Sequence, residues 1–290
     1  MKSIRYSTPG QRADIGHLEI HRLLSNPQSR AIGPFVFLDH ILPREHPPTM
    51  RTGTGAHPHR GIATLTYILE GEGEHFDSAG HHARVYSGGA QWMKAGNGVV
   101  HDETLNADSR SGSQRTHAFQ FWINLPAKIK AEQPEYLSVL ADEVPVKELP
   151  GGAGQLRVIV GGYEDLHSAI PDYSEQFLYH IRLNPQQRVE IPLKAGREAA
   201  AVVPEGEAVI NAHPTPAGTL VAFDTLAGTV ELENPSAGIQ DVLLFGGEPY
   251  REPFVAEGPF VMNSVAELSV AYRDYQAGKY GKISYADSKT

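Results

Sequence analysis

The sequence predicts an all-β protein, and two observations lead to this fold class. The 29 glycines and 21 prolines are spread along the 290 residues, which suits many short strands joined by turns. Short runs rich in β-branched and aromatic residues also recur between turn signals, as expected of strands. The clearest of these runs lie at residues 64–69, 91–94, 118–124 and 156–160.

The second half of the chain repeats the pattern of short strand-like runs seen in the first. The stretch 145–154 (PVKELPGGAG) has the composition of a loop and falls near the middle, where a boundary between two units of similar size is reasonable. We therefore expect one domain over residues 1–145 and another over residues 146–290. Strand-like runs resume at 176–183, 188–191, 199–203, 208–211, 219–223, 229–233 and 241–245.

The pattern changes near the C-terminus, where one helix is predicted over residues 265–277. Residues 264–267 (SVAE) form a capping box, in which the serine and the glutamate each satisfy a free backbone N–H of the first helical turn. Gly278 can end the helix in a left-handed conformation. The apolar positions that follow at helical spacing are Leu268, Ala271, Tyr272 and Tyr275, and they predict packing against a barrel.

Composition excludes several classes of function. The chain has no cysteine, so a metal would be held by imidazole or carboxylate and not by thiolate. The formal charge of −9, without a compensating basic cluster, argues against direct nucleic-acid binding. No run approaches the roughly 20 apolar residues of a membrane span, and the first residues lack the apolar core of a secretory signal. We expect a cytoplasmic protein.

Two pairs of polar residues stand out as candidate metal ligands. His57 and His59 flank Pro58, and in an extended strand residues two apart point to the same face. His101 and Glu103 have the same spacing. On neighbouring strands, the two pairs could direct three nitrogens and one oxygen at a single point. Such a mixed set suits iron, manganese, nickel, copper or zinc.

Chance is the simplest alternative for one pair, because the chain holds 14 histidines. A second pair after a hairpin-rich interval makes metal binding about as plausible as chance on pattern alone. A metal-free structural protein therefore stays open at this point.

Three segments resemble the pirin family of bicupins. They are residues 52–80 (TGTGAHPHRGIATLTYILEGEGEHFDSAG), 91–103 (QWMKAGNGVVHDE) and 119–127 (FQFWINLPA). The resemblance extends to residues 33–35 and 247–263, and it is weakest over about 144–240. One departure is Ala63, where the family usually has an acidic residue that is not a metal ligand.

The resemblance implies a fold of two stacked antiparallel cupin (jelly-roll) β-barrels, of which only the N-terminal one keeps metal ligands. Those ligands map onto His57, His59, His101 and Glu103. The implied cofactor is one divalent transition metal, with Fe²⁺ preferred and nickel, copper, manganese or zinc as alternatives. The C-terminal barrel is expected to lack metal ligands.

The resemblance also implies a function. Several pirin-like proteins are associated with quercetinase activity, in which dioxygen opens the central ring of a flavonol. We expect Glu103 to take the proton of the flavonol 3-hydroxyl, and we expect a small planar aromatic substrate and O2 as partners. The competing hypothesis is a regulatory protein that acts through protein–protein contacts and responds to its metal or redox state.

Other histidines and aromatic residues are left without a site role. We expect His81 and His82 to be exposed in a turn, whereas His75 and His117 could support the site from neighbouring strands. Four aromatic residues are expected in the core, with one or two forming an apolar pocket wall. They are Trp92, Phe119, Phe121 and Trp122.

Overall fold

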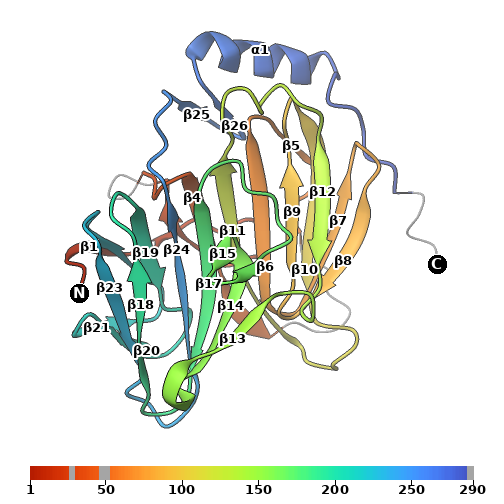
Figure 1. The fold of residues 1–290 in the computed structure, drawn as a ribbon. Coiled ribbons are helices and arrows are strands. Elements are labelled where there is room, and N and C mark those ends of the chain that lie inside the picture. Colours follow the sequence, from red (N-terminus) through yellow and green to blue (C-terminus); the bar gives the residue numbers. More distant parts are fainter. Residues whose placement is uncertain (26–29, 46–52, 286–290) are drawn as a thin grey trace. The chain divides into compact units, whose positions relative to one another are not determined.

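Antiparallel strands make up most of the computed structural model, which describes residues 1–25, 30–45 and 53–285 (Figure 1). Thr52, the first residue of the segment 52–80, lies outside this range. Twenty-six strands, one 3₁₀ turn and one α-helix are assigned within the described residues. The predicted all-β class is confirmed.

The chain forms two compact units, and neither is a continuous half of the sequence. The first unit combines residues 12–20, 41–141 and 251–290, and the second combines residues 1–11, 21–40 and 142–250. The transition between residues 141 and 142 lies close to the expected boundary at 145. The chain ends, however, are exchanged between the units. Residues 1–11 belong to the second unit, and the predicted C-terminal helix belongs to the first.

The first unit contains both candidate ligand pairs. Its strands form one sheet in the order β5-β10-β7-β8 and another that includes β12-β9-β6-β11-β4. The elements are β5 (His57–His59), β6 (Ile62–Glu70), β7 (Glu72–Asp77), β8 (His82–Tyr86), β9 (Ala90–Lys94), β10 (Val99–Asn106), β11 (Arg115–Asn124), β12 (Glu135–Val139), β25 (Val255–Glu257), β26 (Phe260–Met262) and α1 (Val265–Gln276).

Three strands run across the division between the units: β2 (Gln11–Arg12), β3 (Ile20–Leu24) and β4 (Phe35–Glu45). The second unit holds β1 (Ile4–Pro9), β13 (Val146–Glu148), η1 (Pro150–Gly152), β14 (Gly154–Val160), β15 (Gly162–Tyr163), β16 (Leu166–His167), β17 (Gln176–Leu183), β18 (Arg188–Leu193), β19 (Glu198–Val202), β20 (Glu207–Ile210), β21 (His213–Pro216), β22 (Thr219–Phe223), β23 (Gly228–Glu233) and β24 (Gln240–Gly247).

An apolar core fills the second unit. Its sheets have the orders β1-β22-β19-β24-β17-β14-β13 and β18-β23-β20-β21. Leu156, Ile181, Val221 and Leu244 are fully buried in one continuous cluster of apolar side chains. Its members are alternate residues of each strand, such as Phe177, Tyr179, Ile181 and Leu183 of β17, so one face of each strand lines this core.

The register of β10 places the candidate ligands. This strand pairs antiparallel with β5, so that His101 lies opposite His57. On its other side β10 pairs with β7, where Glu103 lies opposite His75. Burial alternates strictly along β10, so His101 and Glu103 share the inner face as the spacing predicts.

The helix forms where the capping box predicts it. The side chain of Ser264 accepts a hydrogen bond from the backbone N–H of Glu267, and α1 ends at Gln276, one residue before the predicted end. Figure 1 shows α1 next to β25 and β26, and its buried Leu268 and Ala271 join Phe260 in one apolar cluster. No described helix is long and apolar enough to cross a membrane.

Candidate metal centre

Three imidazoles converge on the inner face of the sheet formed by β5 and β10. The Nε2 atom of His57 lies 3.1 Å from Nε2 of His59 and 3.0 Å from Nε2 of His101. One ring nitrogen from each of the three residues lies within 4.8 Å of the others. Alternation along β5 and the register between β5 and β10 therefore bring these predicted residues together.

The hydrogen bonds of two of these rings determine which nitrogen carries the proton. Nδ1 of His57 lies 2.8 Å from the carbonyl of Gly55, and Nδ1 of His59 lies 3.0 Å from the carbonyl of Pro259. A carbonyl only accepts, so the neutral form of each ring carries its proton on Nδ1 and presents a lone pair at Nε2. Lone pairs that face each other at 3.1 Å repel, and a cation between them would turn that repulsion into attraction.

The spacing of the nitrogens also fits a bound ion. Metal–nitrogen distances in proteins are about 2.0–2.1 Å, and two nitrogens at right angles around one ion then lie about 2.9 Å apart. The observed separations of 3.0 Å and 3.1 Å are close to that value. The residues present therefore fit a divalent metal held by three imidazoles.

Burial keeps two of these rings neutral. Burial, together with the nearby ring of His57, lowers the pKa of His59 to about 3. Burial and the neighbouring rings of His59 and His57 also lower the pKa of His101 well below its usual value. Because a metal binds only neutral imidazole, both rings are ready for a metal without first losing a proton.

Glu103 lies beside His101, in a second set that overlaps the first. Its carboxylate, His101 and His75 each place a ligand atom within 4.8 Å of the others. Gln120 donates from Nε2 to one oxygen of this carboxylate at 2.6 Å, and the Thr66 hydroxyl lies 3.3 Å from the other. The structure thus brings Glu103 to the edge of the three-histidine cluster, and its role as a fourth ligand stays a prediction.

A chain of polar side chains continues from Glu103 to the surface. Nδ1 of His75 lies 3.8 Å from the Glu103 carboxylate, and Nε2 of His75 lies 3.1 Å from Asp77. Asp77 in turn accepts from Nδ1 of His81 at 2.8 Å, and His81 is partly exposed. Burial alone would lower the pKa of His75, but the two carboxylates outweigh it and raise this pKa above its usual value.

Aromatic rings form the apolar wall of the site. The ring of Trp122 packs edge-on against His59, with centroids 4.9 Å apart. Tyr136 stacks on His75 at 4.3 Å, and burial raises the pKa of its hydroxyl far above the usual value. Of the four aromatic residues expected in the core, Trp122 is partly exposed, and its ring contacts a candidate ligand.

Sequence reasoning missed Gln120 and Thr66. Both lie within runs that were predicted as strands because they are rich in β-branched and aromatic residues. Those strands, β6 and β11, belong to a different sheet from β10, so only the tertiary fold makes the two side chains partners of Glu103. His75 was noted but left without a role, although His75 and Asp77 have the same two-residue spacing as the two ligand pairs. His82 is paired with Glu74, away from the three-histidine cluster.

Comparisons with known proteins agree with this fold. The family model described as Pirin matches residues 17–123, and the one described as Pirin C-terminal cupin domain matches residues 178–281. A pirin-like protein of Caulobacter vibrioides is 34% identical over 272 residues, which cover 92% of this chain and 95% of that one. The chain belongs to the pirin family. Its fold is accordingly a bicupin with two cupin domains, and the pirin family implies a divalent metal.

Two further relatives of this pirin carry a name that refers to a reaction. A Pseudomonas aeruginosa protein, named provisionally as a quercetin 2,3-dioxygenase, is 34% identical over 256 residues, or 88% of this chain and 89% of that one. The crystal structure of a quercetin 2,3-dioxygenase from Acinetobacter baumannii is 29% identical. It matches with a TM-score of 0.90 over 98% of this chain and all of that one.

Proposed function

We propose that this pirin is a metal-dependent dioxygenase of the quercetinase type, which opens the central ring of a flavonol with O2. The observation that carries the proposal is that Nε2 of His57 lies 3.1 Å from Nε2 of His59 and 3.0 Å from Nε2 of His101, with one ring nitrogen from each of the three within 4.8 Å of the others. Similarity to the Acinetobacter quercetin 2,3-dioxygenase supports the choice of substrate class.

The proposed metal ligands are the three histidines and Glu103, and the proposed metal is Fe²⁺. When bound, such a metal supplies Lewis acidity toward an anionic substrate oxygen and one-electron chemistry toward dioxygen. Three or four protein ligands leave positions free on an ion that favours six. An open coordination sphere is what an oxygenase needs and a closed structural site lacks.

Glu103 is the proposed base for the flavonol 3-hydroxyl. An ionised carboxylate only accepts hydrogen bonds, so it can take a proton from a hydroxyl placed beside it. The hydrogen bonds from Gln120 and Thr66 orient the carboxylate while leaving lone pairs for the substrate. His75, at 3.8 Å, is placed to stabilise the charge on Glu103.

The walls of the site suit a flat aromatic ligand. The ring of Trp122 lies against His59, and the buried side chains of Met93, Ala95 and Val99 form an apolar cluster with Tyr136. Glu103 is itself buried, and apolar surroundings strengthen the charge interactions of such a carboxylate with its partners. The substrate of the proposal is therefore a small planar aromatic molecule with an acidic hydroxyl.

The test is an anaerobic titration with quercetin followed by exposure to air. The protein would be loaded in turn with iron, nickel, copper and manganese, and flavonol absorbance and carbon monoxide release would be measured. We expect bleaching with stoichiometric carbon monoxide from at least one metal form. If no metal form bleaches the flavonol, the quercetinase proposal fails.

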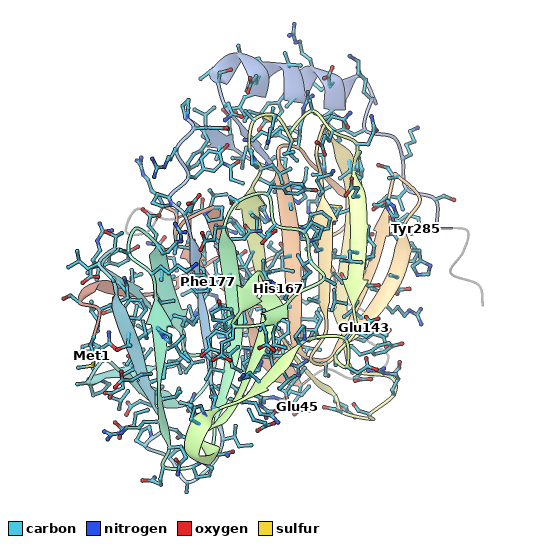
Figure 2. The ribbon with its side chains drawn as sticks, in the orientation of Figure 1. Met1, Glu45, Glu143, His167, Phe177 and Tyr285 are labelled. Carbon is cyan, nitrogen blue, oxygen red and sulfur yellow. The ribbon has the colours of Figure 1, made fainter. Side chains whose placement is uncertain are left out.

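Two variants separate metal binding from chemistry. His101→Ala removes a proposed ligand and should abolish both metal retention and bleaching. The control is His167→Ala, the same substitution at an exposed histidine of the second unit (labelled in Figure 2). It should change neither metal retention nor bleaching. Equal metal content in the two variants would contradict the assignment of His101.

A further inference from the structure

The C-terminal segment supplies the hydrogen bond that orients one proposed ligand. Nδ1 of His59 donates to the carbonyl of Pro259 at 3.0 Å, a contact across 200 positions of sequence. His57, by contrast, donates to Gly55, which is two residues away. In metal sites the partner of the second ring nitrogen fixes the tautomer and the ring orientation. For His59 that partner lies outside the strands that carry the ligands.

Strand β26 holds the Pro259 carbonyl in place by pairing with the residue that follows His59. Arg60 forms a parallel bridge with Phe260, and the backbone N–H of Val261 donates to the Arg60 carbonyl at 3.1 Å. Gly61 permits this approach: its φ is +83°, and a Cβ there would meet the Val261 carbonyl at 2.0 Å. The two segments therefore touch backbone to backbone.

Side chains of α1 and of the turn after it secure the same residue. The Arg60 guanidinium donates to Asp274 at 2.8 Å and lies 3.3 Å from the Tyr280 hydroxyl. That hydroxyl donates to the carbonyl of Ala271 at 2.8 Å. Arg60 is thus held between the helix and the residues that follow it, one position from a proposed metal ligand.

The segment also reaches the second ligand strand. Tyr285, labelled in Figure 2, donates its hydroxyl to Asp102 at 2.8 Å. Asp102 lies between His101 and Glu103 and points to the opposite face of β10 from them, as alternation requires. Residues 259–285 therefore contact both strands at positions next to the proposed ligands.

We propose that residues 259–285 position the metal ligands, with Asp274 and Tyr280 acting through Arg60 on the contact between His59 and Pro259. This inference rests on the metal site of the proposed function. It assigns positioning roles to residues that touch neither metal nor substrate. Changes in α1 then alter the affinity and the electronic environment of the metal without removing a ligand.

Co²⁺ is the probe for the test, because its visible absorption bands report ligand geometry. The full-length variants Asp274→Asn and Tyr280→Phe remove the charge that pairs with Arg60 and the hydroxyl that contacts Arg60, respectively, and keep the side-chain shape. Glu257→Gln is the matched control for Asp274→Asn: it makes the same change of charge just before residues 259–285, on an exposed side chain of β25. Co²⁺ affinity would be measured by competition with a chelator.

We expect Asp274→Asn and Tyr280→Phe to weaken Co²⁺ binding by about tenfold, which is the lower end of the losses seen when residues that hold metal ligands in place are mutated. Both variants should also shift the Co²⁺ absorption bands. Glu257→Gln should match the parent protein in both respects. A merely structural role would lower thermal stability without moving the bands, so unchanged bands and affinity in both variants would overturn the inference. If the parent protein itself binds no Co²⁺, the proposed metal site fails instead.

Discussion

Acidification should destabilise the metal-free protein through His59. The folded ring stays neutral down to a pKa of about 3, whereas an unfolded histidine takes up a proton near the ordinary value of 6.5. Between these two values the unfolded state binds more protons than the folded state. The free energy of unfolding must therefore fall as the pH falls through this window.

The size of the effect follows from the same two pKa values. At about pH 5.5 the unfolded ring is mostly charged and the folded ring is neutral, so linkage predicts a loss of about 1.4 kcal/mol relative to about pH 7.5. His101, whose pKa is also lowered by burial, adds to the loss. His75 opposes it, because its pKa is raised.

A variant removes the titrating ring of His59. His59→Asn keeps a donor near the position of Nδ1 but does not titrate. Urea unfolding of the chelator-treated parent and variant at both pH values would give the difference between their pH dependences. His213→Asn, at an exposed histidine of the second unit, is the control and should behave as the parent does.

The reasoning predicts that the parent loses about 1.4 kcal/mol more than His59→Asn on acidification. The same pH dependence in the two proteins would refute it, because His59 would then take up its proton equally well in the folded and the unfolded state. A parent that becomes more stable at the lower pH would mean that His75 outweighs the two neutral rings.

Three further predictions concern separate parts of the molecule. Gln120→Ala removes the 2.6 Å hydrogen bond to Glu103 and should lower flavonol turnover about 10- to 100-fold, measured by bleaching; unchanged turnover would remove Gln120 from the site. Ser264→Ala removes the N-cap of α1 and should cost about 1 kcal/mol of unfolding free energy, measured by urea denaturation; no loss would mean that the cap is compensated. Leu244→Ala opens a cavity in the apolar core of the second unit and should cost about 2–5 kcal/mol with unchanged Co²⁺ affinity, and a lower affinity would tie that core to the metal site.

Local periodicity determined much of what the sequence could predict. A strand repeats every two residues, so the spacing of His57 with His59 and of His101 with Glu103 is enough to place each pair on one face. The strand runs and the capped helix follow from equally local rules of turn chemistry and backbone capping. The prediction of these elements needed no knowledge of how the sheets pair.

Only the tertiary structure decided which residues surround the candidate ligands. The register of β10 with β7 places His75 beside Glu103, the position of β11 brings in Gln120, and β26 delivers the Pro259 carbonyl to His59. It also decided that the C-terminal helix belongs to the first unit. Contacts between residues far apart in the chain depend on strand order and register, which a periodic pattern within one segment does not encode.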